Sequence, residues 1–127
     1  MSKRRVVVTG LGIVSPVGNT VSAAWENIIS GKSGITRITR FDASNFASQI
    51  AGEVKDFDIQ QYLSVKEARR MDIFIHYGMA AAIQAIKDAG IEDVTHFDSE
   101  RIGVNIGSGI GGLPMIENTD TAYHAGG

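Results

Sequence analysis

Residues 101–113 read R-I-G-V-N-I-G-S-G-I-G-G-L, and the fold expected for the whole chain is built around this stretch. Apolar side chains recur at Ile102, Val104 and Ile106, and this alternation predicts a short strand. The strand leads directly into a turn that begins at Gly107 and contains four glycines. In α/β proteins, a strand followed by a glycine turn is where the backbone comes close to a ligand.

The same glycines match the pattern G-x-G-x-x-G of dinucleotide-binding domains. Such domains hold the ribose with an acidic residue about 20 positions further along the chain. Asp120 comes too early for that role. We therefore expect Gly103, Asn105 and the glycines that follow to make room for a packed helix. A nucleotide-binding oxidoreductase domain is kept as the alternative.

A second strand is predicted at residues 5–9, where a continuous apolar run is typical of a strand buried on both faces of a parallel sheet. A glycine turn follows this strand too, but Pro16 falls where a dinucleotide-binding helix should be under way. The next helix is instead expected to begin at Asn19 or Thr20, either of which can cap it, and to end at Gly31.

The strongest helix signal begins at Ser64, which forms an S-x-x-E capping box with Glu67. Apolar residues recur at spacings of three and four, and they predict one helix to Ala89, closed by Gly90. Another face of this helix is lined by small residues that let a second element approach closely. These are Gly78, Ala81 and Ala85.

The order is strand, helix, irregular stretch, helix and strand, which predicts an α/β fold with a mostly parallel sheet and packed helices. The irregular stretch covers residues 34–57 and includes a short strand near 49–54. A last helix is expected from Met115 to about Tyr123, with Pro114 in its first turn. Two certain strands make a poor sheet, so we expect this fold to be incomplete.

Composition narrows the function classes. The chain has 127 residues, 43% hydrophobic residues and a net charge of −2, which gives no general attraction to nucleic acid or to a membrane surface. The apolar runs are too short to span a bilayer, and no signal-peptide cleavage site follows the basic start, so we expect a cytoplasmic protein. The absence of cysteine excludes disulfides, thiolate metal sites and a cysteine nucleophile within the chain.

No catalytic constellation is visible in the sequence. The three histidines have no metal-ligand spacing, and Ser108 lacks the glycine spacing of a nucleophile elbow. A basic cluster formed by Lys66, Arg69 and Arg70 projects from one side of the long helix. From the pattern alone it is a solvated helix end, and its functional alternative is a landing site for an acidic partner.

Several stretches taken together resemble the N-terminal part of the β-ketoacyl-acyl carrier protein synthases, most closely synthase II. They are V-V-V-T-G-L-G-I-V-S-P-V-G-N (6–19), G-K-S-G-I (31–35), R-F-D (40–42), V-K-D-F-D (54–58), K-E-A-R-R-M-D (66–72) and residues 101–113. The resemblance covers essentially the whole chain in order. It implies that residues 1–127 are the N-terminal portion of a thiolase-like domain whose first glycine turn packs and binds no nucleotide.

The resemblance also implies the chemistry. Members of the family elongate fatty acyl chains by decarboxylative Claisen condensation, using an active-site cysteine and two histidines. Those residues follow the region matched here, so the chain is expected to contain no catalytic residue and to be inactive by itself. The substrates are carried on the phosphopantetheine of acyl carrier protein, no other cofactor or metal is implied, and the full-length enzyme is expected to be a homodimer.

Two sets of site residues carry over from the family. Gly109, Ile110 and Leu113 fall where synthase II lines its acyl pocket. The basic cluster, Lys66, Arg69 and Arg70, falls where the family contacts its acidic carrier protein. A non-catalytic module that binds the carrier protein, or a decarboxylase-like partner subunit, is a further alternative.

Overall fold

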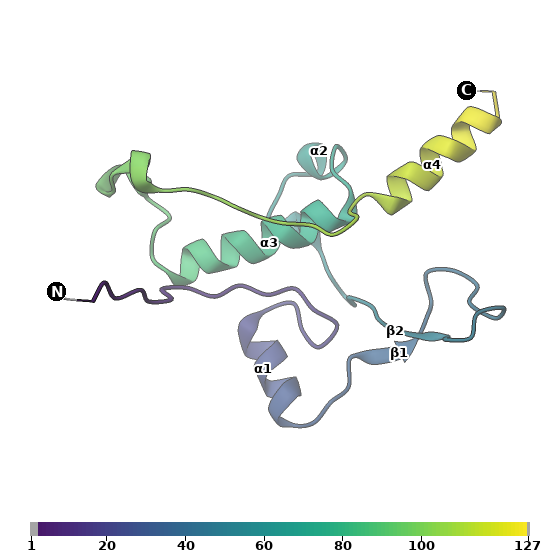
Figure 1. Cartoon of the computed structure of the whole chain (residues 1–127), viewed down its shortest axis with the longest axis horizontal. Coiled ribbons are helices and arrows are strands. Elements are labelled where there is room, and N and C mark those ends of the chain that lie inside the picture. The colour runs from purple at the N-terminus through teal and green to yellow at the C-terminus, as the bar shows by residue number, and fades with distance from the viewer. Residues whose placement is uncertain (1–2, 127) are drawn as a thin grey trace.

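The computed structural model describes residues 3–126 (Figure 1). The α-helices are α1 (Val21–Ile29), α2 (Val65–Ala68), α3 (Ile73–Asp88) and α4 (Leu113–His124). The strands are β1 (Ile35–Arg37) and β2 (Ile50–Gly52), and the 3₁₀ turns are η1 (Ile59–Gln61), η2 (Val94–His96) and η3 (Ser99–Arg101). The helix α3 runs through the middle of the molecule, and α4 projects away from it (Figure 1).

The first glycine turn packs directly on α3. A Cβ added at Gly12 would overlap the carbonyl oxygen of Ala81, and one added at Gly10 would overlap that of Ala85. The backbone N–H of Leu11 donates to the Asp88 carboxylate at 2.9 Å, which fastens the turn to the end of the helix. The predicted face of small residues on α3 is therefore confirmed at Ala81 and Ala85.

The segment that contains residues 102–111 lies along the other half of the same helix (Figure 1). The Ile106 side chain lies beside Gly78, where an added Cβ would be 3.7 Å from it, and Gly111 lies against the ring of Phe74. Residue numbers rise along this segment as they fall along α3, and the same is true of the first glycine turn. The two extended segments therefore run parallel to each other.

Neither predicted strand forms a ladder in the structure. No backbone–backbone hydrogen bond joins residues 5–9 or 103–106 to any other residue between 3 and 126. Val6, expected to be buried on both faces, is 88% exposed. The predictions of a buried strand at 5–9 and of a strand at 102–106 are wrong here, because an apolar run becomes a strand only where a neighbour supplies hydrogen bonds and cover.

The sheet found within residues 3–126 is small and antiparallel. It pairs Ile35 with Gly52 and Arg37 with Ile50, which confirms the short strand expected near 49–54. The mostly parallel sheet of the sequence-based prediction is not formed among these residues. The structure confirms the coarser prediction, a partial α/β fold in which helices and strands are mixed.

The single long helix predicted from Ser64 to Ala89 is wrong, because it breaks into α2 and α3. After α2, Arg70 N–H and Met71 N–H donate to carbonyls three residues back, a tight turn that ends the helix. Asp72 then adopts an extended backbone, and its carboxylate accepts from Ile73 N at 2.6 Å. An aspartate in this position caps a new helix.

The other helices follow their sequence signals. Thr20 caps α1 by accepting from Ala23 N at 3.3 Å, and Gly31 follows its end with φ 68°. Pro114 lies in the first turn of α4. Both helices were predicted from these capping residues, and both predictions are confirmed.

Much of the apolar surface remains uncovered. The buried hydrophobic side chains within residues 3–126 are all alanines: Ala24, Ala43, Ala68 and Ala80. The accessible surface is 10429 Å², against roughly 6,600 Å² for a compact chain of this mass. Nowhere in residues 3–126 is a helix both long and apolar enough to cross a membrane.

Candidate functional site

The basic cluster is an exposed group of three cations around α2. Lys66, Arg69 and Arg70 are all exposed, and none of their side chains bonds to another residue within 3–126. The nearest carboxylate in sequence, Glu67, is held in the cap instead, where it accepts from the Ser64 hydroxyl at 2.6 Å and from its N–H at 3.1 Å. These hydrogen bonds lower the pKa of Glu67.

The second carboxylate near the cluster is also occupied. One Asp72 oxygen accepts from Ile73 N, and the other accepts from Met115 N at 3.3 Å. Glu67 and Asp72 are thus both held by hydrogen bonds at helix ends. The three cations therefore face solvent without an ion pair to either carboxylate.

The predicted acyl-pocket residues lie on one turn at the start of α4. The Ile110 side chain is 80% exposed and that of Leu113, the first residue of α4, is 53% exposed. Ile110 has φ 57°, a left-handed conformation that β-branched residues rarely adopt. The structure therefore brings Gly109, Ile110 and Leu113 together on an exposed and conformationally unusual turn.

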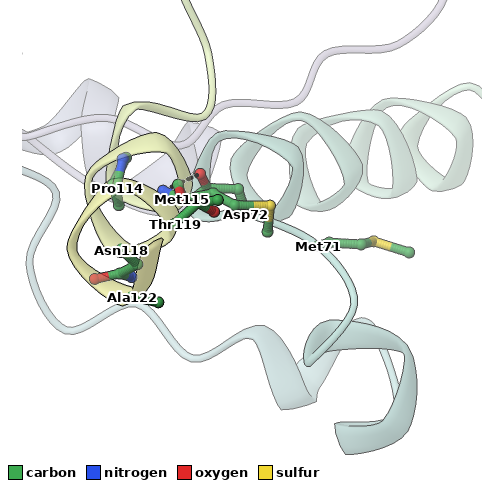
Figure 2. A pocket seen from close by; sticks show the side chains of 7 residues that line it. All are labelled: Met71, Asp72, Pro114, Met115, Asn118, Thr119 and Ala122. Carbon is green, nitrogen blue, oxygen red and sulfur yellow. Dashed lines mark hydrogen bonds between the residues drawn. The ribbon is translucent and has the colours of Figure 1, made fainter. Parts of the chain in front are cut away.

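Two residues at the start of α3 hold this turn. The ring of Phe74 lies so close to Gly111 that an added Cβ would be 2.6 Å from two of its carbons. Asp72 holds the start of α4 through its hydrogen bond to Met115 N (Figure 2). The turn is thus fixed to α3 on the C-terminal side of Ile110.

A pocket of 510 Å³ separates the start of α3 from α4 (Figure 2). Met71 and Asp72 line one side, while Pro114 and Met115 line the other. Arg70 immediately precedes Met71 in the chain, and Leu113 immediately precedes Pro114. The predicted site residues themselves are not among those that line this pocket.

The glycine turn does not have the features of a phosphate cradle. Met115 N, at the start of α4, already donates to the Asp72 carboxylate, so this helix end faces a negative charge of the protein's own. A pyrophosphate there would be repelled. The expectation that these glycines make room for a helix is confirmed at Gly111, but it is wrong at Gly103, Gly107 and Gly109, where an added Cβ would meet open space.

The three histidines are engaged locally. His96 lies 3.4 Å from Asp93 and His124 lies 3.5 Å from Asp120, both as exposed pairs. The Nε2 atom of His76 lies 2.9 Å from the carbonyl oxygen of Ala68. In the part of the chain that the structure describes, no three His, Asp or Glu side chains gather in a way that could hold a metal ion.

Two residues of the site were missed by the sequence-based reasoning. Asp72 carries a local signal, because an aspartate before the apolar run Ile73-Phe74-Ile75 is typical of a helix cap. Phe74 carries no such signal. Its role depends on a contact with Gly111, 37 positions later in the chain.

The comparison with known families decides the identity of this fold. Residues 3–127 match the family model described as the β-ketoacyl synthase N-terminal domain. The chain belongs to this family. The resemblance of the motif stretches is thereby confirmed over nearly the whole length of the chain.

The relatives of this β-ketoacyl synthase chain agree in name. It is 59% identical over 117 residues to 3-oxoacyl-[acyl-carrier-protein] synthase 2 of Vibrio harveyi, covering 92% of this chain and 28% of that protein. It is 52% identical over 127 residues to the synthase 2 of Coxiella burnetii, covering 99% of this chain and 30% of that protein. The chain thus spans less than a third of the length of these relatives.

Solved ketosynthases share the fold. A structure described as a type II polyketide acyl-carrier protein in complex with its ketosynthase (AntDE:AntF) matches with a TM-score of 0.72 and 31% identity, over 94% of this chain and 31% of that one. The ishigamide ketosynthase/chain length factor matches with a TM-score of 0.61 and 35% identity, over 71% of this chain and 22% of that one.

Proposed function

We propose that this chain is the N-terminal part of a 3-oxoacyl-[acyl-carrier-protein] synthase II, which elongates fatty acyl chains by decarboxylative condensation. The observation that carries this proposal is the 59% identity to a synthase 2 over 92% of the chain. The chain has no cysteine, so the nucleophile belongs to the remainder of the full-length protein. What the chain supplies is a docking surface for the carrier protein and part of the acyl pocket.

In the proposed reaction, the acyl group first moves from the thioester of its carrier protein to the cysteine of the enzyme. Malonyl-carrier protein then loses CO₂, and the electron pair of the broken C–C bond attacks the acyl carbon. A new C–C bond forms while the C–S bond to the enzyme breaks, which returns the cysteine thiolate. The products are 3-oxoacyl-carrier protein and CO₂.

The basic cluster is the proposed contact with the acidic carrier protein. Its support is geometric, because Lys66, Arg69 and Arg70 are exposed while Glu67 and Asp72 are committed to helix caps. An exposed basic patch of this kind steers a partner of opposite charge toward it. Its position beside the pocket that α4 borders would bring the carrier protein close to the acyl site.

The finer form of the fold is also a proposal. We infer that residues 5–9 and 102–106 become neighbouring strands of a parallel sheet in the full-length protein. Both segments already run antiparallel to α3 and therefore parallel to each other, as two strands joined through a helix do. Their exposed valines would be covered when the sheet is complete.

We propose a cytoplasmic homodimer that needs no cofactor beyond the phosphopantetheine of its carrier protein. A nucleotide-binding oxidoreductase is disfavoured by the carboxylate at the start of α4. A non-catalytic module that binds the carrier protein is the second candidate, and the exposed basic cluster would serve it equally well.

The full-length protein should convert acyl- and malonyl-carrier protein into 3-oxoacyl-carrier protein, with one CO₂ released for each product. Ile110→Phe should shorten the longest acyl chain that is accepted, because the larger ring fills the pocket. We expect kcat/KM for the longest acyl chains to change at least tenfold, since one methylene in an apolar pocket contributes about 1–3 kcal/mol to transition-state binding. The measurement is kcat/KM across a series of acyl-carrier proteins.

A matched control is Ile50→Phe on β2, which makes the same change on another exposed surface. Its chain-length profile should stay like that of the wild type. An unchanged profile in Ile110→Phe would remove Ile110 from the acyl pocket. Binding of the carrier protein without any product would favour the non-catalytic module.

A further inference from the structure

The left-handed backbone at Ile110 must be held by its surroundings. A β-branched residue with φ 57° is strained compared with the same residue in an ordinary conformation. Such strain persists only where neighbouring contacts impose it. The contacts that impose it here therefore also set the direction in which the Ile110 side chain points.

Phe74 makes the closest of these contacts. Two carbons of its ring would lie 2.6 Å from a Cβ at Gly111, and a third would lie 3.8 Å from one at Gly112. Phe74 is the second residue of α3, so its backbone is fixed by the helix. Phe74 is 37% exposed, so its ring packs beside the turn and is not part of a closed hydrophobic core.

Asp72 completes the arrangement from the other side. It caps α3 through Ile73 N and holds the first turn of α4 through Met115 N. The short segment between Gly111, which packs on Phe74, and Met115, which is held by Asp72, therefore has little freedom. A second pocket of 360 Å³ is lined by Phe74, Gly78 and Ile106 among others, so removal of the ring would enlarge the space beside the turn.

We propose that Phe74 is a positioning residue that holds the turn at Ile110 in its left-handed form and so sets the length of acyl chain accepted. Phe74 acts through Ile110 and does not itself contact the acyl chain. This inference rests on the proposed function, because it assigns a specificity role within the same pocket. Asp72 fixes the start of α4, while Phe74 controls the conformation of the turn.

The test uses the full-length protein and two acyl-carrier protein donors, one near the longest accepted length and one short. In Phe74→Ala, the ratio of kcat/KM for the long donor to that for the short donor should change roughly tenfold, the effect of a displaced pocket wall. Phe74→Tyr keeps the ring and should restore the wild-type ratio. Phe41→Ala removes an exposed phenylalanine elsewhere and should leave the ratio unchanged.

The decisive comparison is made in the Ile110→Gly background. If Phe74 acts through Ile110, then Phe74→Ala should have no further effect on the ratio once the isoleucine side chain is gone. An equal effect in both backgrounds would overturn the proposal, as would an equal loss of kcat/KM for both donors. Phe74→Leu keeps most of the apolar volume and takes the place of alanine if that variant fails to fold.

The activity of the wild-type protein separates a failure of the proposed function from a failure of the role proposed for Phe74. If the wild-type protein makes no 3-oxoacyl product with either donor, the proposed function fails, and the role of Phe74 fails with it. If the wild-type protein is active and the Phe74→Ala ratio equals that of the wild type, the positioning role alone is overturned.

Discussion

Gly12→Ala should destabilise the full-length protein by about 3 kcal/mol, the upper end of the usual cost of overpacking, because overpacking against backbone cannot be relieved by moving a side chain. The added methyl would overlap the carbonyl oxygen of Ala81 and lie 2.9 Å from the nitrogen of Ala85. Both atoms belong to α3, so either the helix or the first glycine turn must move. Thermal unfolding of the purified protein measures the loss.

Gly107→Ala is the matched control, because it adds the same methyl group outside the proposed strand 102–106, at a position with no atom beyond its chain neighbours within 4 Å. Its melting temperature should stay close to that of the wild type, as expected for a substitution without a new contact. If Gly12→Ala had the same melting temperature as the wild type, the packing of the first glycine turn on α3 would be wrong.

Reversing the charge of the basic cluster should raise KM for the carrier protein by about tenfold to a hundredfold at low salt, with little change in kcat. The expected size reflects three exposed ion pairs of up to about 1 kcal/mol each. The variant carries glutamate at Lys66, Arg69 and Arg70. The difference between variant and wild type should shrink as salt is added, because exposed charges are screened. Steady-state kinetics at several salt concentrations measure both effects.

A control for total charge reverses Lys32, Arg37 and Lys55, three exposed cations outside the cluster. The total charge change is the same, but KM should stay near the wild-type value. An equal rise in KM in both variants would mean that the net charge of the protein attracts the carrier protein. In that case the cluster is a solvated helix end.

Local signals in the sequence predicted the helices well. The cap at Thr20, the box at Ser64 and Glu67, and Pro114 each begin a helix in the structure. Such signals work because they satisfy backbone groups within a few residues of themselves. The small face of α3 was also predictable, since closely packed backbones need residues without large side chains.

Most of the failures concern interactions between distant parts of the chain. The alternation at Ile102, Val104 and Ile106 is typical of a strand, but pattern alone cannot supply a hydrogen-bonding neighbour. The helical spacing of apolar residues continued through Asp72, so it concealed the break between α2 and α3. The contact of Phe74 with Gly111 has no local pattern at all.

The candidate site was likewise predictable only in part. The basic cluster and the turn at Ile110 were located through the resemblance of their motifs. That Glu67 and Asp72 are committed to helix caps, and that Ile110 is left-handed, became visible only in the structure. These details decide how exposed the charge is and how the turn is held.

The central claim is that the chain contributes surfaces to a condensing enzyme whose nucleophile lies elsewhere in the protein. The most direct test is to incubate the full-length protein with acyl-carrier protein, without malonyl-carrier protein, and to map the acyl group by mass spectrometry of peptides. The account predicts a single acyl adduct on a cysteine outside residues 1–127. An adduct on a side chain within residues 1–127, or no adduct at all, would contradict it.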